Sequence, residues 1–118
     1  MWALNAAAFS AICEWRIHLM DQYFLGKFVV VRSYSAGVHA GIVESVEADR
    51  VRLQAGALRL WRWQAKGKTT GALHSVAKFG LGDGSKTEAS AGAVQVNAVI
   101  ELIEVAPAAV KTFSEVWK

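Results

Sequence analysis

The chain has 118 residues, of which 53% are apolar and 19% are charged, and its net charge is +3. This length suits a single domain with its own core, and so high an apolar content excludes a disordered chain. No apolar run reaches the roughly 18 residues that a membrane-spanning helix needs, which predicts a soluble protein without a membrane partner. The single cysteine, Cys13, excludes an internal disulfide and favours a reducing compartment, so we expect a cytoplasmic location.

Residues 1–22 are expected to be an N-terminal extension that precedes one β-rich domain over residues 23–118. The extension is apolar and contains small residues, as a signal peptide does, but no basic residue precedes its apolar stretch. Arg16 lies where a cleavage site would be, which argues against secretion. Met20 is an alternative start, because the strand pattern begins only after it, and we expect residues 1–19 to be dispensable for folding.

Four strands with short turns are predicted in the first half of the domain. Gly37 is placed in the first turn, where glycine can adopt a positive φ. Gly41, inside a predicted strand, indicates a bulge or the close approach of another backbone. Such a succession is typical of the β-meander of small SH3-like barrels. The four predicted strands are residues 28–33, 38–46, 50–54 and 58–64.

The second half predicts two helices separated by a loop and more strand. Thr69 or Thr70 can cap the first helix, Gly80 ends it, and Pro107 precedes the second. The fold class that follows is α+β: a small SH3-like β-meander or half-barrel with a short middle helix and a C-terminal helix. The expected elements are a helix over 71–79, a mobile glycine- and serine-rich loop over 80–92, one or two strands over 93–105 and a helix over 108–117.

No pattern in the sequence predicts catalysis, a metal site or a cofactor. Residues 80–87 resemble a phosphate-binding loop, but Ser85 separates Gly84 from Lys86, and a helix is expected before the loop where a strand is needed. The three histidines are far apart in the sequence and lack the spacing of metal ligands. We therefore expect a binding protein and not an enzyme.

The segment Arg59–Trp63 is the most informative part of the sequence. Under strict alternation on a strand, Arg59, Trp61 and Trp63 share one face, while Leu58, Leu60 and Arg62 lie on the other. Both faces are too apolar to be ordinary solvent faces. Three interpretations stay open for the tryptophans: a place in the core, a contact between subunits, or a ligand site.

Basic residues near these tryptophans favour the ligand site slightly. Arginine beside an exposed aromatic ring suits bases and phosphates, through stacking and bidentate hydrogen bonds. The alternative is that these arginines are solvated residues at sheet edges. The candidate ligand-binding residues are Arg32, Tyr34, His39, Arg52, Arg59, Trp61 and Trp63.

Residues 29–41 read VVVRSYSAGVHAG, and Arg-Leu-Trp-Arg-Trp follows at 59–63. With these two segments the chain resembles a family of small uncharacterised bacteriophage proteins, which share a VVVR-[ST]-YSAGVH-x-G core and an R-[IL]-W-x-W strand. The resemblance is close over residues 26–64 and loose beyond them. It implies a phage context inside an infected host cell and attaches no activity to the protein.

The function expected from these features is that of a phage-encoded, non-catalytic binding protein. A homo-oligomer is favoured, because five tryptophans and two apolar strand faces exceed what one small core hides. The expected ligand is a nucleotide or another phosphate-bearing anion, as for a counter-defence protein that sequesters a nucleotide signal. The alternatives are a nucleic-acid-binding module and a protein-interaction inhibitor of a host enzyme.

Overall fold

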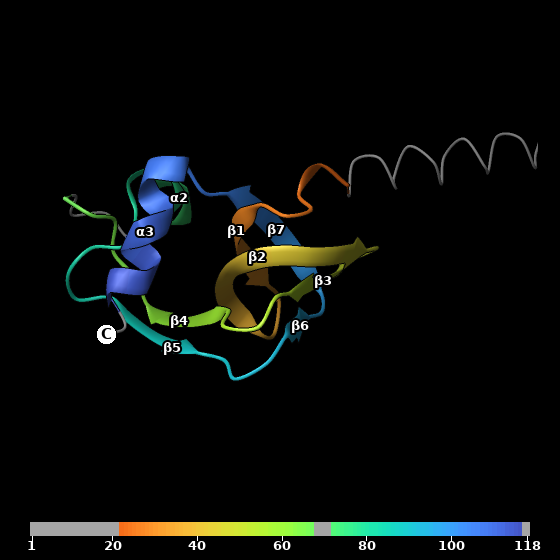
Figure 1. Ribbon diagram of the computed structural model, residues 1–118. Coiled ribbons are helices and arrows are strands. Elements are labelled where there is room, and N and C mark those ends of the chain that lie inside the picture. Colours follow the sequence, from red (N-terminus) through yellow and green to blue (C-terminus); the bar gives the residue numbers. More distant parts are fainter. Residues whose placement is uncertain (1–21, 68–71, 117–118) are drawn as a thin grey trace, which may run out of the picture.

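The computed structural model describes residues 22–67 and 72–116, with side chains up to residue 114. This part of the chain is mostly antiparallel sheet, with two short helices (Figure 1). The predicted extension up to residue 21, the start at Met20 and the capping residues Thr69 and Thr70 lie outside the described residues. The elements are β1 (Phe28–Ser33), β2 (Gly37–Glu47), β3 (Arg50–Leu53), β4 (Leu58–Arg62), α2 (Leu73–Phe79), β5 (Lys86–Ala89), β6 (Val94–Val96), β7 (Val99–Glu104) and α3 (Pro107–Val116).

The predicted class, α+β with an SH3-like β-meander or half-barrel and a middle helix, is wrong. The described residues form an open antiparallel sheet of seven strands, so the domain is more β-rich than expected. One cause is β5, which forms inside the segment expected to be a mobile loop. It exists because it pairs along β4, with Ala89 opposite Leu58 and packed on the core. Such long-range pairing overrides a local composition rich in glycine and serine.

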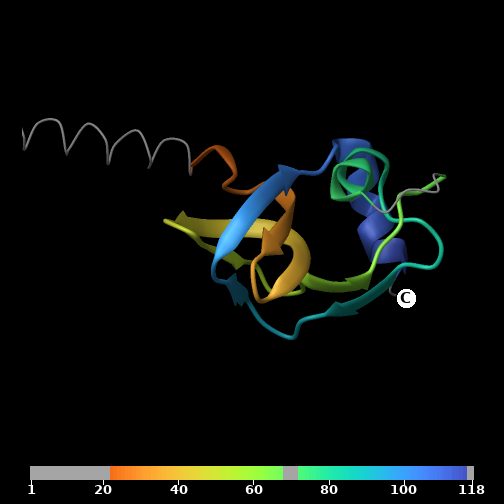
Figure 2. The same cartoon turned by 180° about the vertical axis from the view of Figure 1, so that it is seen from behind.

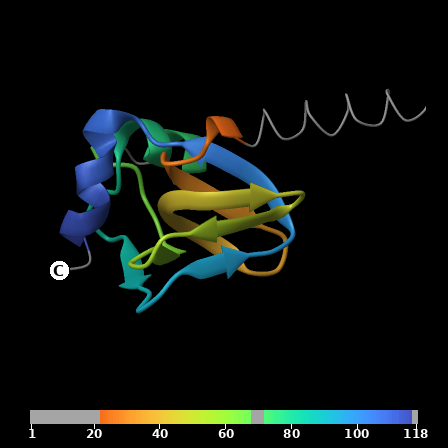
Figure 3. The same ribbon diagram turned by 45° about the vertical axis from the view of Figure 1, so that its right-hand side comes forward.

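The long strand β2 organises the sheet. The strand order is β5-β4-β2-β1-β7, and β3 pairs with β2 and with β6. The first part of β2 pairs with β4 and its last part pairs with β3, while β1 runs along its other edge. Figure 3 shows the β2–β3 hairpin reaching away from the helices. Gly41 lies in the middle of β2, where a Cβ atom would be 3.0 Å from Cβ of Ala57. The close approach expected at this glycine is therefore confirmed.

Two cores lie on opposite faces of the central strands. In β1, Val30 packs in the cluster that faces the helices, while Val29 and Val31 pack in a second cluster with residues of β2, β3 and β6. This is why β1 is a continuous apolar run and not an alternating one. Helices α2 and α3 pack together over the first cluster, with Phe113 fully buried (Figures 1 and 2). None of the described helices is long and apolar enough to cross a membrane.

Candidate functional site

A β-bulge at Trp61 separates the two tryptophans that were expected to lie together. Leu60 lies opposite Thr87 and Arg62 lies opposite Lys86, so Trp61 is an extra residue in β4. An extra residue shifts the alternation of side chains by one position. Trp63 accordingly packs on the same core cluster as Leu60, whereas Trp61 contacts Arg59. The prediction that Arg59, Trp61 and Trp63 share one face, with Arg62 on the other, is therefore wrong.

One face of β4 and β5 carries a surface that we call the ridge. Residues opposite each other in antiparallel strands point to the same side of the sheet, and so do residues two apart in one strand. By this rule Arg59 shares its side with Glu88, Glu88 with Lys86, and Lys86 with Arg62. Trp61 belongs to the same surface because its ring contacts Arg59, and Trp61 is 55% exposed. The ridge consists of Arg59, Trp61, Arg62, Lys86 and Glu88.

Arg59 connects the ridge to the turn between β1 and β2. Its Nη1 donates a hydrogen bond to the carbonyl oxygen of Ala36, and its guanidinium carbon lies 4.2 Å from the centroid of the Trp61 ring. The side chain occupies a niche over Gly37, whose φ is +79°, and a Cβ atom there would lie 2.5 Å from Nη2. The positive φ expected at Gly37 is confirmed. Because its guanidinium is engaged and half-buried, Arg59 positions Trp61 and the turn.

His39 of β2 lies opposite Arg59 of β4, so its half-buried side chain is on the same side of the sheet as the ridge. Burial lowers the pKa of His39, and the positive charge of Arg59 lowers it further. The ring is therefore neutral at neutral pH. Its Nδ1 and the Nε of Arg59 are buried and make no hydrogen bond within the described part of the chain. His39 thus adds no positive charge to the ridge.

Two cations of the ridge stand directly opposite each other. Arg62 pairs in register with Lys86, and both side chains are exposed. Among the described residues, neither takes part in any of the ion pairs. Like charges directly opposite each other in a sheet are destabilising. An anion bound between them would remove this repulsion.

The opposite face of the sheet contains a concave site, which we call the groove. It is a cavity of about 550 Å³ between the sheet and the beginning of α2. Its apolar wall includes Trp63, which is half-buried against the core. The residues that line the groove are Arg32, Val38, Trp63, Ala72, Leu73, His74 and Glu101.

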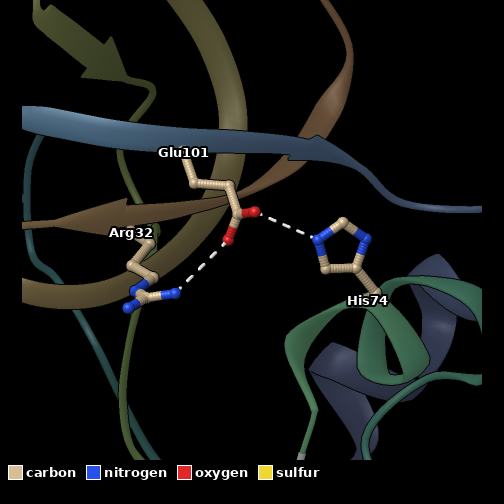
Figure 4. Close-up of polar contacts among 3 residues, drawn as sticks. All are labelled: Arg32, His74 and Glu101. Carbon is tan, nitrogen blue, oxygen red and sulfur yellow. Dashed lines mark hydrogen bonds and ion pairs between the residues drawn. The ribbon is translucent and has the colours of Figure 1, made fainter.

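Glu101 contacts both His74 and Arg32 in the groove (Figure 4). One carboxylate oxygen lies 3.0 Å from Nε2 of His74, and the other lies 3.8 Å from Nη1 of Arg32. These contacts join β1, β7 and α2. The arginine of the groove, Arg32, therefore already faces a carboxylate, in contrast to Arg62 and Lys86 of the ridge.

Tyr34 and Arg52 belong to neither the ridge nor the groove, although Tyr34 lies on the turn that Arg59 contacts at Ala36. Tyr34 is 84% exposed on the turn between β1 and β2. Arg52, on β3, donates a hydrogen bond to Gln95 (3.3 Å) and lies 4.0 Å from Glu44. Arg52 is thus a solvated surface arginine, but it does not lie at a sheet edge, because β3 pairs with β2 on one side and with β6 on the other. The seven predicted residues fall into separate places and do not form one site.

The predicted site residues did not include Arg62, Lys86 or Glu101, which are members of these surfaces. Lys86 was placed in a mobile loop, and Glu101 gave no signal beyond its position in a β-prone segment. Only the pairing of β4 with β5 and of β1 with β7 brings them into place. In the described ranges, 22–67 and 72–116, no three side chains of His, Cys, Asp or Glu are grouped to hold a metal ion.

Comparison with known proteins gives one match. Residues 26–113 match the family described as a domain of unknown function, DUF6948. Neither the curated proteins nor the solved structures contain a significant match.

Proposed function

Because the chain belongs to the DUF6948 family, whose description as a domain of unknown function names no activity, we propose a function from its surface chemistry. The protein binds a phosphate-bearing ligand at the ridge and does not catalyse a reaction. Trp61 supplies a stacking surface for a base, and Arg62 and Lys86 contact phosphate oxygens.

The observation that carries this proposal is the opposed pair Arg62 and Lys86 beside an exposed Trp61. A pair of like charges without a carboxylate partner lowers the stability of the fold when no ligand is bound. A phosphate between them forms charge-assisted hydrogen bonds with both, and these are roughly twice as strong as neutral ones.

Arg59 prepares the stacking surface. A cation within about 6 Å of a ring centroid is attracted to the face of the ring, and here the distance is 4.2 Å. The contact holds the indole and leaves more than half of the side chain open to solvent. Because the hydrogen bond to Ala36 fixes Arg59 in turn, a ligand meets a ring that is already ordered.

The groove supports an anionic ligand less well than the ridge. Its concave form is the usual setting for a small molecule. However, a phosphate placed on Arg32 or His74 would lie near the carboxylate of Glu101, which repels it. The ridge contains three cations and one carboxylate, so its charge favours an anion.

The biological role that we propose is the one implied by the resemblance to phage proteins. In it, the protein acts in the cytoplasm of the infected cell, as a counter-defence protein or another accessory protein, and forms a homo-oligomer. These features rest on the resemblance and on composition, and the ridge is compatible with them.

The proposal is tested with two charge-matched double variants. Arg62→Gln with Lys86→Gln removes the opposed pair, and Arg50→Gln with Arg52→Gln removes the same charge from exposed arginines that have carboxylate neighbours. Binding of ATP and of a labelled ten-nucleotide single strand is measured for both. We expect the ridge variant to lose roughly tenfold or more in affinity and the control less than about threefold, since only the former loses direct phosphate contacts. Equal losses, or no binding of either probe by the native chain, would contradict the proposal.

A further inference from the structure

The ridge is open, and this limits the kind of ligand that it can hold. Trp61 is 55% exposed, and Arg62 and Lys86 are exposed beside it. Sites for small molecules usually enclose most of the surface of their ligand. An open platform contacts one face of a base and one or two phosphates. A free nucleotide bound there gains few contacts, whereas a longer ligand can add contacts at a second platform.

Tyr34 provides that second platform. It is 84% exposed, the most exposed of the large apolar and aromatic side chains of the described residues. The backbone below it is held on both sides: the amide of Tyr34 donates to the carbonyl of Ala98 (3.0 Å), and the amide of Ala36 donates to Oγ of Ser33 (3.0 Å). Oγ of Ser33 in turn donates to the carbonyl of Asn97 (2.8 Å). Because this turn is already fixed, a ligand that stacks on Tyr34 costs little backbone conformational entropy.

The β1–β2 turn and the ridge are linked by one side chain, Arg59. Arg59 contacts the turn at Ala36 and Gly37, and it also contacts the ring of Trp61. Arg59 thus links the ring of Trp61 to the turn on which Tyr34 lies. Repeated stacking platforms along a cationic surface are the usual design of proteins that bind single strands without reading their sequence.

We propose that the ridge and Tyr34 together bind single-stranded nucleic acid of at least two nucleotides. Bases stack on Trp61 and Tyr34, and the backbone phosphates lie near Arg62 and Lys86. This inference rests on the proposed function and names its ligand class. It specifies a single strand because the bases of a duplex are stacked on one another and their faces are closed to the protein.

The first test varies the ligand. Binding of a fluorescently labelled ten-nucleotide single strand is followed by anisotropy, with the matching duplex and a mononucleotide as competitors. We expect the single strand to bind at least tenfold more tightly than either competitor. Its affinity should fall with salt with a logarithmic slope of about −1.4, because each phosphate contact on a single strand contributes about −0.7.

The second test varies the platforms. Trp61→Ala and Tyr34→Ala should each weaken binding of the single strand by roughly five- to a hundredfold, the range expected for one base stacked on an aromatic ring. Trp61→Phe should restore part of the loss. The matched control is Ile100→Ala, because Ile100 is 57% exposed but lies on β7. Thermal melting of each variant shows whether the fold is retained.

The outcomes separate this inference from the proposed function. If a mononucleotide binds at the ridge as tightly as the single strand, or if Tyr34→Ala has no effect, the inference is wrong and the proposed function stands. If the duplex binds as tightly as the single strand, the inference is likewise wrong. If neither ATP nor the single strand binds the native chain, both are wrong.

Discussion

The ridge and the groove lie on opposite faces of the same sheet and contain similar side chains, a tryptophan with basic residues around it. In the groove, Glu101 contacts His74 and faces Arg32, so the charge of Arg32 is balanced within the protein. On the ridge, Arg62 faces Lys86 and no carboxylate closes the pair within the described chain. Arrangement, more than composition, therefore distinguishes a polar contact that holds the fold together from one that is open to a ligand.

The tryptophans give the largest expected difference between the two surfaces. Trp63→Ala should lower the free energy of unfolding by about 2 kcal/mol or more, because the half-buried ring packs on the core. Trp61→Ala should lower it by less than about 1 kcal/mol, because that ring is mostly solvent-exposed. Urea denaturation of both variants measures the difference. Equal losses would show that the bulge does not separate the two rings.

A backbone substitution tests the niche that holds Arg59. Gly37→Ala should cost about 1–2 kcal/mol for the positive φ alone, and its Cβ would also displace the guanidinium. The matched control is Gly56→Ala, because Gly56 has a φ of +87° but no atom near its added Cβ. Both variants should therefore be strained, and only Gly37→Ala should also weaken ligand binding at the ridge. Chemical denaturation and anisotropy measure the two effects. Identical behaviour in both assays would show that the niche has no role in binding.

The pH dependence of stability probes the buried side of the ridge. Burial first, and the charge of Arg59 second, lower the pKa of His39 in the fold below its ordinary value of 6.5. As the pH falls, the unfolded chain therefore binds more protons than the folded chain. The contribution of neutral His39 to the free energy of unfolding is complete above pH 6.5 and is lost as the pH falls below it. His39→Gln should flatten the dependence between pH 7.5 and 5.5, as measured by thermal melting in buffers of equal ionic strength. An unchanged dependence would assign the effect to another group.

The smallest expected effect on stability comes from Glu101→Gln in the groove. The contacts of Glu101 with Arg32 and His74 are partly exposed, so their loss should cost less than about 1 kcal/mol. The substitution should, however, leave Arg32 without its counter-charge and allow an anion to bind in the groove. We expect the variant to gain salt-sensitive binding of the single strand that persists when Trp61→Ala is added. If no such binding appears, charge balance is not what keeps the groove closed to anions.

Much of the local structure could be predicted from the sequence. The runs that form β1 to β4, the helix α2 ending at Gly80 and the two strands β6 and β7 follow short-range patterns of apolar residues and turn residues. The positive φ of Gly37 and the close packing at Gly41 also follow from local rules, because only glycine fits such positions. The strand and helix runs depend on neighbours in the sequence, whereas Gly41 packs against Ala57 from another segment of the chain.

The fold class and the site depended on contacts between distant residues, which sequence periodicity does not contain. Strict alternation placed Trp61 and Trp63 together, but the pairing of β4 with β5 introduces a bulge that turns them to opposite faces. The same pairing converts a predicted loop into a strand and brings Lys86 opposite Arg62. In the groove, Glu101 meets His74 across 27 positions of the chain. Local patterns specify which side chains each strand offers. Tertiary pairing specifies which of their charges are balanced, because the register of a sheet is set by the whole ladder of contacts and not by any one strand.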